Sequence, residues 1–182
     1  MKKIILLFVV LAFNLKTNAQ KINWISMNEA LELQKKNPKK IMVDIYTNWC
    51  GPCKMLDKHT FSNEDVVNYV NENYYAVKFN GEGNETVNYK ENTFTNPNYN
   101  SSKSNTRNSS HQFADYLRLR GYPTIAFFDE QAGFITPITG YYKPQQLEFY
   151  LKLFVNNKHK EIKSKEKFNE YYKAFKPTFK TK

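Results

Sequence analysis

The sequence predicts an α/β fold in which helices cover both faces of a central mixed β-sheet. The first observation is a mostly apolar run over residues 40–46, as expected for a strand buried on both faces. The second is a pair of runs rich in β-branched and aromatic residues, at 74–79 and 124–128. The third is the order of the elements, which is β-α-β-α-β, an interruption, and then α-β-β-α. Such an order favours a sheet between two helical layers.

The first half of the chain carries clear signals for where helices begin. Ser26 and Glu29 form a capping box, so a helix should begin there and end at Asn37, before a proline. Pro52 suits the first turn of a helix, so another helix should begin near Cys50. The elements expected up to residue 79 are strands at 22–25, 40–46 and 74–79, and helices at 26–37, from Cys50 to His59, and from 62 through Val70.

Residues 81–110 differ in composition from the rest of the chain. They include eight Asn and five Ser, and almost no aliphatic residues. A loop of this length is unusual inside a compact domain unless it is functional or disordered. Two interpretations stay open: a tolerated polar insertion, since long surface loops cost little entropy, or a flap that faces substrate or selects partners. A short helix is expected inside it, at about 85–91.

The pattern becomes regular again after the insertion. Apolar residues at helical spacing predict a helix over 144–155. In the segment 164–176, aromatic side chains could share one helical face and lysines the other, so this helix either docks on the domain or contacts a partner. The other elements expected here are a helix at 111–119 ended by Gly121, strands at 124–128 and 134–136, and a turn at 129–133.

The N-terminus resembles a targeting signal rather than part of the fold. A short basic start precedes ten apolar residues at 4–13, and small residues follow at 17–19. This pattern predicts a secretory signal peptide cleaved after Ala19. Ten apolar residues are too few for a membrane anchor, which needs about 20. The mature protein is therefore expected to be exported and soluble, periplasmic or secreted, without a membrane span.

The net charge of +10 is concentrated at the two ends of the chain. Three lysines belong to the predicted signal peptide, and residues 158–182 contribute nine Lys against three Glu. The body between them is nearly neutral, so nucleic-acid binding is not expected of this exported chain. We therefore expect three parts: a signal peptide at 1–19, a domain at 20–157 that contains the insertion, and a basic, helical tail at 158–182.

The chain contains two cysteines, Cys50 and Cys53, in the sequence Cys-Gly-Pro-Cys. Export permits a disulfide between them, but so small a loop would stabilise the fold little, so we expect a chemical role. Cys50 follows a strand and begins a helix, where free N–H groups favour its thiolate and lower the pKa. Such a thiolate can attack a disulfide, and Cys53 can then resolve the mixed disulfide. Gly51 and Pro52 should keep the ring tight and leave the first sulfur exposed.

Metal binding is the alternative use of this motif. His59 and His111 could complete a four-ligand site with the cysteines. A Cys-x-x-Cys pair without a second matching pair is weak evidence for a closed site, however, and Pro52 suits redox chemistry. We expect both histidines at the surface, and no metal or cofactor.

Residues 43–54, Val-Asp-Ile-Tyr-Thr-Asn-Trp-Cys-Gly-Pro-Cys-Lys, resemble the active-site signature of the thioredoxin superfamily. The resemblance covers about 24–155, in two blocks separated by the insertion. The stretch 54–62 is more similar to the C-terminal domain of exported transmembrane thiol reductases. The resemblance implies a thioredoxin fold, in which Gly121-Tyr122-Pro123-Thr124 is the cis-proline loop facing the disulfide.

The resemblance also implies roles for individual residues. Asp44 corresponds to the buried acid, whose pKa desolvation raises, and it would accept the proton of Cys53. Lys78 corresponds to its basic partner. A cis bond before Pro123 would let a substrate chain pair beside Tyr122. The residues implied to contact substrate are Trp49, Gly51, Pro52, Tyr122, Pro123 and Gly140.

The resulting hypothesis is a monomeric, exported thiol–disulfide oxidoreductase that reduces disulfides in partner proteins. The Gly-Pro pair between the cysteines resembles that of reducing thioredoxins. A reductase in an oxidising compartment needs electrons from across the membrane, so a transmembrane thiol carrier is the expected donor. Two alternatives stay open: a disulfide donor or isomerase, and a redox-inert binding module or metallochaperone on the same fold.

Overall fold

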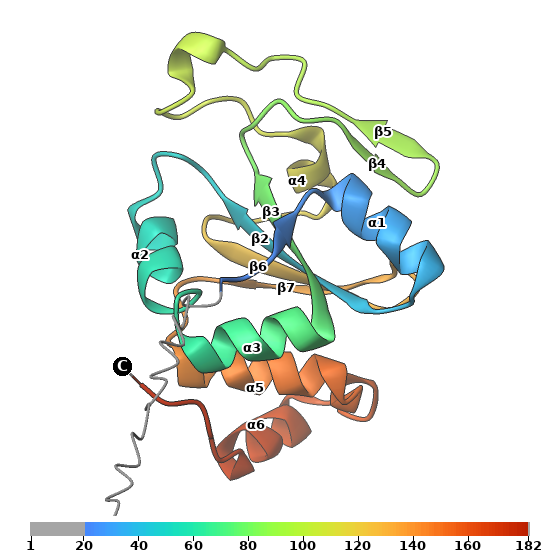
Figure 1. The fold of residues 1–182 in the computed structure, drawn as a ribbon, viewed down its shortest axis with the longest axis vertical. Coiled ribbons are helices and arrows are strands. Elements are labelled where there is room, and N and C mark those ends of the chain that lie inside the picture. Colours follow the sequence, from blue (N-terminus) through green and yellow to red (C-terminus); the bar gives the residue numbers. More distant parts are fainter. Residues whose placement is uncertain (1–20, 182) are drawn as a thin grey trace, which may run out of the picture.

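A five-stranded sheet forms the centre of the computed structural model, which describes residues 21–181 (Figure 1). Its strand order is β1-β3-β2-β6-β7. The strands β1, β3 and β2 run parallel to one another, β6 is antiparallel to β2, and β7 is antiparallel to β6. The predicted mixed sheet is confirmed. The predicted signal peptide lies outside the described residues. The strands are β1 (Trp24–Ile25), β2 (Lys40–Tyr46), β3 (Tyr74–Asn80), β6 (Thr124–Phe128) and β7 (Phe134–Thr139).

Helices pack against both faces of this sheet (Figure 1). Side chains alternate along a strand. In β2, Ile41 and Val43 therefore enter the apolar cluster beneath α1 and α4, whereas Met42 enters the cluster shared with α2, α3 and α5. The same alternation places Asp44 on the face that α2 covers. The helices are α1 (Met27–Lys36), α2 (Gly51–His59), α3 (Glu64–Asn73), α4 (Gln112–Tyr116), α5 (Pro144–Val155) and α6 (Lys165–Ala174).

The insertion contains a β-hairpin where the sequence suggested a short helix. The strands β4 (Val87–Tyr89) and β5 (Asn92–Phe94) pair around a turn at Lys90, whose φ of 56° is left-handed. Val87 and Tyr89 are buried while the residue between them is exposed, so the apolar period is two rather than that of a helix. Tyr89 packs edge-on against the rings of Phe113 and Phe128. The expected helix at 85–91 is therefore wrong.

Two further elements differ in extent from the prediction. The helix expected at 111–119 spans only Gln112–Tyr116, because the His111 side chain caps its start and Arg118 adopts a left-handed φ of 54° after its end. The strand expected at 134–136 continues to Thr139 and includes Pro137. A proline is tolerated there because β7 is the edge strand of the sheet.

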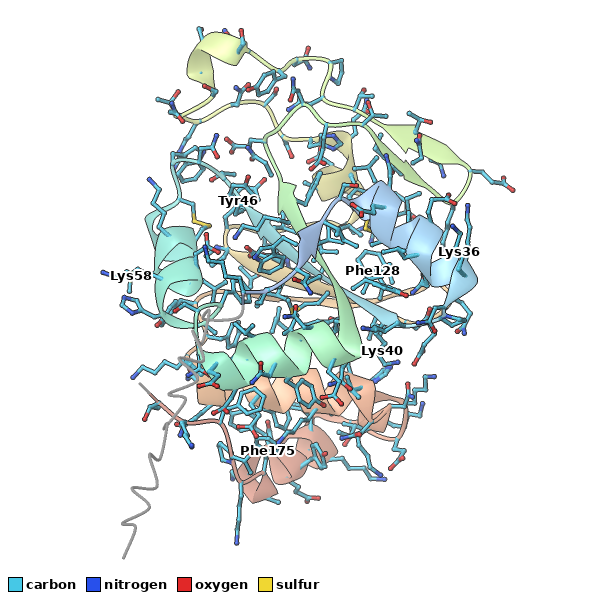
Figure 2. The ribbon with its side chains drawn as sticks, in the orientation of Figure 1. Lys36, Lys40, Tyr46, Lys58, Phe128 and Phe175 are labelled. Carbon is cyan, nitrogen blue, oxygen red and sulfur yellow. A yellow bond between two sulfur atoms is a disulfide. The ribbon has the colours of Figure 1, made fainter. Side chains whose placement is uncertain are left out.

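The basic tail docks on the domain. The rings of Phe168, Tyr171, Tyr172 and Phe175 surround Phe149 of α5, at centroid distances of 4.8–5.7 Å. Figure 2 labels Phe175 at this junction of α5 and α6. Of the two possibilities for the 164–176 helix, the structure therefore places its aromatic face on the domain.

Glu148 of α5 fastens the last residues of the tail. This carboxylate is fully buried and accepts hydrogen bonds from the Thr178 N–H and hydroxyl, the Phe179 N–H and the Lys152 ammonium, at 2.6–2.9 Å. Although burial alone would raise the pKa of Glu148, these donors hold it below its usual value. Between residues 21 and 181, no helix is long and apolar enough to cross a membrane.

Candidate active site

Cys50 and Cys53 form a disulfide at the start of α2. The chain leaves β2 at Tyr46 and turns through a hydrogen bond from the Cys50 N–H to the Thr47 carbonyl, at 3.1 Å. Cys50 then caps the helix, because its Sγ accepts the backbone N–H of Cys53 at 3.1 Å. On reduction, this N–H and the positive end of α2 would stabilise a thiolate on Cys50.

The cysteines are less accessible than the sequence suggested. Gly51 and Pro52 are exposed, but Cys50 exposes only 2 % of its surface and Cys53 only 3 %. The Cys50 sulfur is turned back over the first turn of α2 and bonded to a buried partner, so the expectation of an exposed first sulfur is wrong. A partner would approach over the Gly51-Pro52 corner.

Asp44 is a buried acid whose hydrogen-bonding capacity is only half used. Its Oδ2 accepts from the Lys78 ammonium at 2.5 Å, whereas Oδ1 is buried without a hydrogen-bond partner among the described residues. Burial raises the pKa of Asp44 to about 6, despite the attraction of Lys78. The expected rise in its pKa is confirmed. Such a group can exchange a proton near neutral pH.

Lys78 connects this acid to the helix that carries the cysteines. Parallel pairing places Asp44 and Lys78 at the same register of β2 and β3. The Lys78 ammonium also bonds to Asp57 of α2, one turn after Cys53, and lies over the Trp24, Tyr46 and Phe61 rings. Burial alone would lower the pKa of Lys78, but the two carboxylates hold it above its usual value. The sequence analysis missed Asp57, although its four-residue spacing from Cys53 on one helix was a usable signal.

The cis-proline loop lies beside the residue that precedes Cys50. The Tyr122-Pro123 bond is cis, as expected, and the Pro123 carbonyl accepts the Gly140 N–H at 2.9 Å. Gly140 has a φ of 122°, which a side chain would strain. The Tyr122 ring packs edge-on against Trp49, with centroids 6.3 Å apart. The structure thus brings the Cys-x-x-Cys loop, the proline loop and Gly140 toward one site.

Two residues of the insertion also reach this site, and the sequence analysis missed both. The Trp49 indole N–H donates to the Glu82 carboxylate at 2.8 Å, and the Arg107 guanidinium lies 4.8 Å over the Trp49 ring. Glu82 and Arg107 both belong to the polar insertion, and its composition does not indicate where the chain runs relative to the cysteines.

The histidines do not join the cysteines. His59 is exposed, as expected, but His111 is completely buried, so the surface prediction for it is wrong. Its Nδ1 accepts the Phe113 N–H, and its Nε2 lies 2.6 Å from the Glu85 carbonyl. Burial lowers the pKa of His111, which suits a neutral, structural ring. Across residues 21–181, no cluster of three or more His, Cys, Asp or Glu side chains is arranged to hold a metal ion.

The fold and the Cys50–Cys53 disulfide define a thiol–disulfide oxidoreductase of the thioredoxin-like class. The sequence profile of the Thioredoxin-like domain matches residues 27–154, and the chain belongs to this family.

Relatives and solved structures agree with this assignment. The thiol:disulfide interchange protein DsbD of Pectobacterium atrosepticum is 28% identical over 134 residues, which are 72% of this chain and 19% of that protein. The chain thus spans about a fifth of the length of this relative. A thioredoxin from Thermus thermophilus superposes with a TM-score of 0.55 at 16% identity, over 74% of this chain and 87% of that one. The DsbH oxidoreductase superposes with a TM-score of 0.54 at 15% identity, over 76% and 87%.

Proposed function

We propose that this protein is an exported reductase of disulfides in partner proteins. The observation that carries the proposal is the Cys50–Cys53 disulfide at the N-terminus of α2, a helix whose Asp57 is linked through Lys78 to Asp44, a buried acid with one oxygen lacking a hydrogen bond among the described residues. A thiolate stabilised at the helix end is the attacking group of thiol–disulfide exchange, and an acid that titrates near neutral pH can accept the proton of the second thiol.

The reaction consists of two exchange steps. The Cys50 thiolate attacks one sulfur of a partner disulfide, so a Cys50–partner bond forms, the partner bond breaks, and the other partner sulfur leaves as a thiolate. The Cys53 thiol then loses its proton to Asp44 and attacks the Cys50 sulfur. The Cys50–Cys53 disulfide forms, the second partner sulfur leaves and takes the proton from Asp44, and the first partner thiolate takes up a proton from solvent. Two electrons pass to the partner, which becomes a dithiol.

Lys78 is assigned the role of holding Asp44 in place and adjusting its pKa. Its ammonium is fixed between Asp44 and Asp57, so the proton acceptor keeps one counter-ion while its other oxygen stays available.

The partner chain is proposed to bind across the cis-proline loop. Backbone groups beside Tyr122 would pair with an extended substrate, as a strand added to a strand. Pro123 and Gly140 are proposed to contact the partner chain together, which is supported by the hydrogen bond from the Gly140 N–H to the Pro123 carbonyl. Trp49 and the exposed Gly51-Pro52 corner would contact the partner around its disulfide.

The electron source is proposed to be a transmembrane thiol carrier. The predicted signal peptide favours a location outside the cytoplasm, where a reductase cannot draw on cytosolic thiols. The DsbD relatives are named for thiol–disulfide interchange, which is consistent with such a chain of exchanges.

The test is a comparison of the wild type with Cys50→Ser and Cys53→Ser. With a dithiol donor, the wild type should reduce insulin disulfides, Cys50→Ser should be inactive, and Cys53→Ser should accumulate a mixed disulfide through Cys50. The reduction potential of the pair should lie near that of reducing thioredoxins, about −270 mV. An inactive wild type, or a potential near −120 mV as in strong oxidants, would overturn the reductase proposal.

A further inference from the structure

A segment of the insertion is fixed against the residues that directly precede Cys50. The Asn48 side-chain amide donates to the Ser104 carbonyl at 2.7 Å. The Asn108 N–H donates to the Glu82 carboxylate at 2.8 Å, and the same oxygen accepts the Trp49 indole N–H. Residues 104–108 are therefore attached at both ends to the approach to the disulfide. In Figure 1 this part of the chain lies above the loop that leads into α2.

The rest of the insertion holds this segment in place. Its two ends meet through the hydrogen bond from the His111 N–H to the Gly81 carbonyl, at 2.9 Å. Across its middle, the buried Asn96 amide donates to the carbonyls of Gly83 and Ser109, at 3.0 and 2.9 Å. The insertion is thus a closed, cross-linked loop, and the position of residues 104–108 is set before a partner arrives.

Arg107 lies between the two attachment points. Its guanidinium is stacked 4.8 Å over the Trp49 ring, and the residue is exposed. Glu82, the acid that the Trp49 indole contacts, also accepts the Asn108 N–H. Across the part of the chain that the structure describes, Arg107 forms no salt bridge and donates no side-chain hydrogen bond. The N–H donors of the Arg107 guanidinium are therefore oriented by the indole ring and open to solvent.

We propose that Arg107 is a specificity-determining residue that binds a carboxylate side chain beside the disulfide of the partner protein. This inference rests on the proposed function, because it names the kind of partner that the Cys50–Cys53 site accepts. A planar guanidinium pairs with a carboxylate through two parallel hydrogen bonds, and stacking on an aromatic ring fixes its plane in advance. Two other exposed side chains, those of Lys54 in α2 and of Lys103, carry the same positive charge as Arg107.

The experiment measures the rate at which the pre-reduced protein reduces three disulfide-linked peptides. The peptides differ only in the residues that flank the cysteine, which are Glu, Gln or Lys. The variants are Arg107→Gln, Arg107→Lys and Arg107→Glu. The control is Lys163→Glu, which makes the same charge reversal at an exposed residue two positions before α6, and Figure 1 shows α6 at the opposite end of the molecule from β4 and β5 of the insertion. A neutral small disulfide, 2-hydroxyethyl disulfide, reports the thiol chemistry without peptide recognition.

The wild type should reduce the Glu peptide about three- to fivefold faster than the Gln peptide at low salt, the range expected of an exposed ion pair. Arg107→Gln should abolish the preference, Arg107→Glu should reverse it toward the Lys peptide, and Arg107→Lys should keep part of it. Lys163→Glu should behave as the wild type. Added salt should weaken the preference. Lys163→Glu should reduce the neutral disulfide as fast as the wild type, and the peptide rates of each Arg107 variant are compared with its own rate on the neutral disulfide.

Two results would overturn the inference. If the wild type reduces the neutral disulfide but treats the three peptides alike, Arg107 does not select partners, while the reductase proposal stands. If Arg107→Glu retains the wild-type order, the selectivity arises elsewhere. A wild type that cannot reduce even the neutral disulfide would instead remove the proposed function on which the inference rests.

Discussion

Replacing Asp44 by Asn should stabilise the oxidised protein at neutral pH. The ordinary pKa of this carboxyl is 3.8, and burial raises it to about 6 in the fold. The folded state therefore binds this proton more tightly than the unfolded chain does. The stability linked to Asp44 is highest below pH 4, falls as the pH rises from about 4 to about 6, and reaches its minimum above that range.

The size of the effect follows from the pKa. A rise from 3.8 to about 6 corresponds to about 3 kcal/mol at pH 7.5, since one pKa unit is worth about 1.4 kcal/mol. Asparagine removes the buried charge, but it also takes one of two carboxylate partners from Lys78. The pKa of about 6 already includes the attraction of Lys78, so we allow about 1 kcal/mol only for the weaker hydrogen bonding of the amide and expect a gain of about 2 kcal/mol. For a domain of this size, this corresponds to a rise in Tm of roughly 4–8 °C.

The assay is thermal unfolding of the oxidised protein, followed by circular dichroism at pH 7.5 and pH 4. Asp44→Asn should unfold at a higher temperature than the wild type at pH 7.5, and the difference should nearly vanish at pH 4. Asp57→Asn is the matched control: it takes the other carboxylate from Lys78 without removing the buried charge, so it should give no gain. A gain of equal size at both pH values would refute the reasoning, as would a destabilised Asp44→Asn at pH 7.5.

Three further outcomes are expected. The lowered pKa of His111 means that its stability contribution is present above pH 6.5 and is lost on acidification, so the protection factors for amide exchange in the insertion should fall as the pH is lowered from 6.5; unchanged protection factors would argue against this anchor. Gly81→Ala would place a methyl group 2.5 Å from the Tyr122 ring, so insulin reduction should fall about tenfold while reduction of a small neutral disulfide is spared; equal loss for both substrates would contradict this. Glu148→Gln should cost about 2 kcal/mol in urea unfolding, because the donors of Thr178 and Phe179 lose a charged acceptor; an unchanged midpoint would refute it.

The sheet and the redox centre could be predicted because their signals are local. The apolar run over 40–46 and the Cys-x-x-Cys that follows it are contiguous, and the resemblance supplied Asp44, Lys78 and the cis-proline. The pairing of Asp44 with Lys78 depends on strand register, which a parallel sheet with both faces buried specifies strongly.

The contacts of Glu82 and Arg107 with Trp49 could not be predicted, because they depend on the path of a long polar loop. Glu82 and Arg107 are 25 residues apart, and both meet Trp49 only because amide side chains cross-link the loop. Polar composition left open a tolerated insertion or a flap, because it cannot tell a cross-linked loop from a free one. The surface position predicted for His111 was wrong for a related reason. The sequence does not show that its ring caps a helix and donates to a carbonyl, because both contacts depend on how the insertion folds.

Two carboxylates are buried among residues 21–181, and their surroundings differ in the number of hydrogen-bond donors. Glu148 is surrounded by donors, three of them from the last residues of the chain, whereas one oxygen of Asp44 has no donor. Proteolytic removal of the residues after Phe175 would take those three donors away and leave Glu148 with Lys152 alone. The clipped protein would then lose part of the stability that the lowered pKa of Glu148 contributes at neutral pH, so damage at the far end of the molecule would appear as a loss of stability that shrinks on acidification.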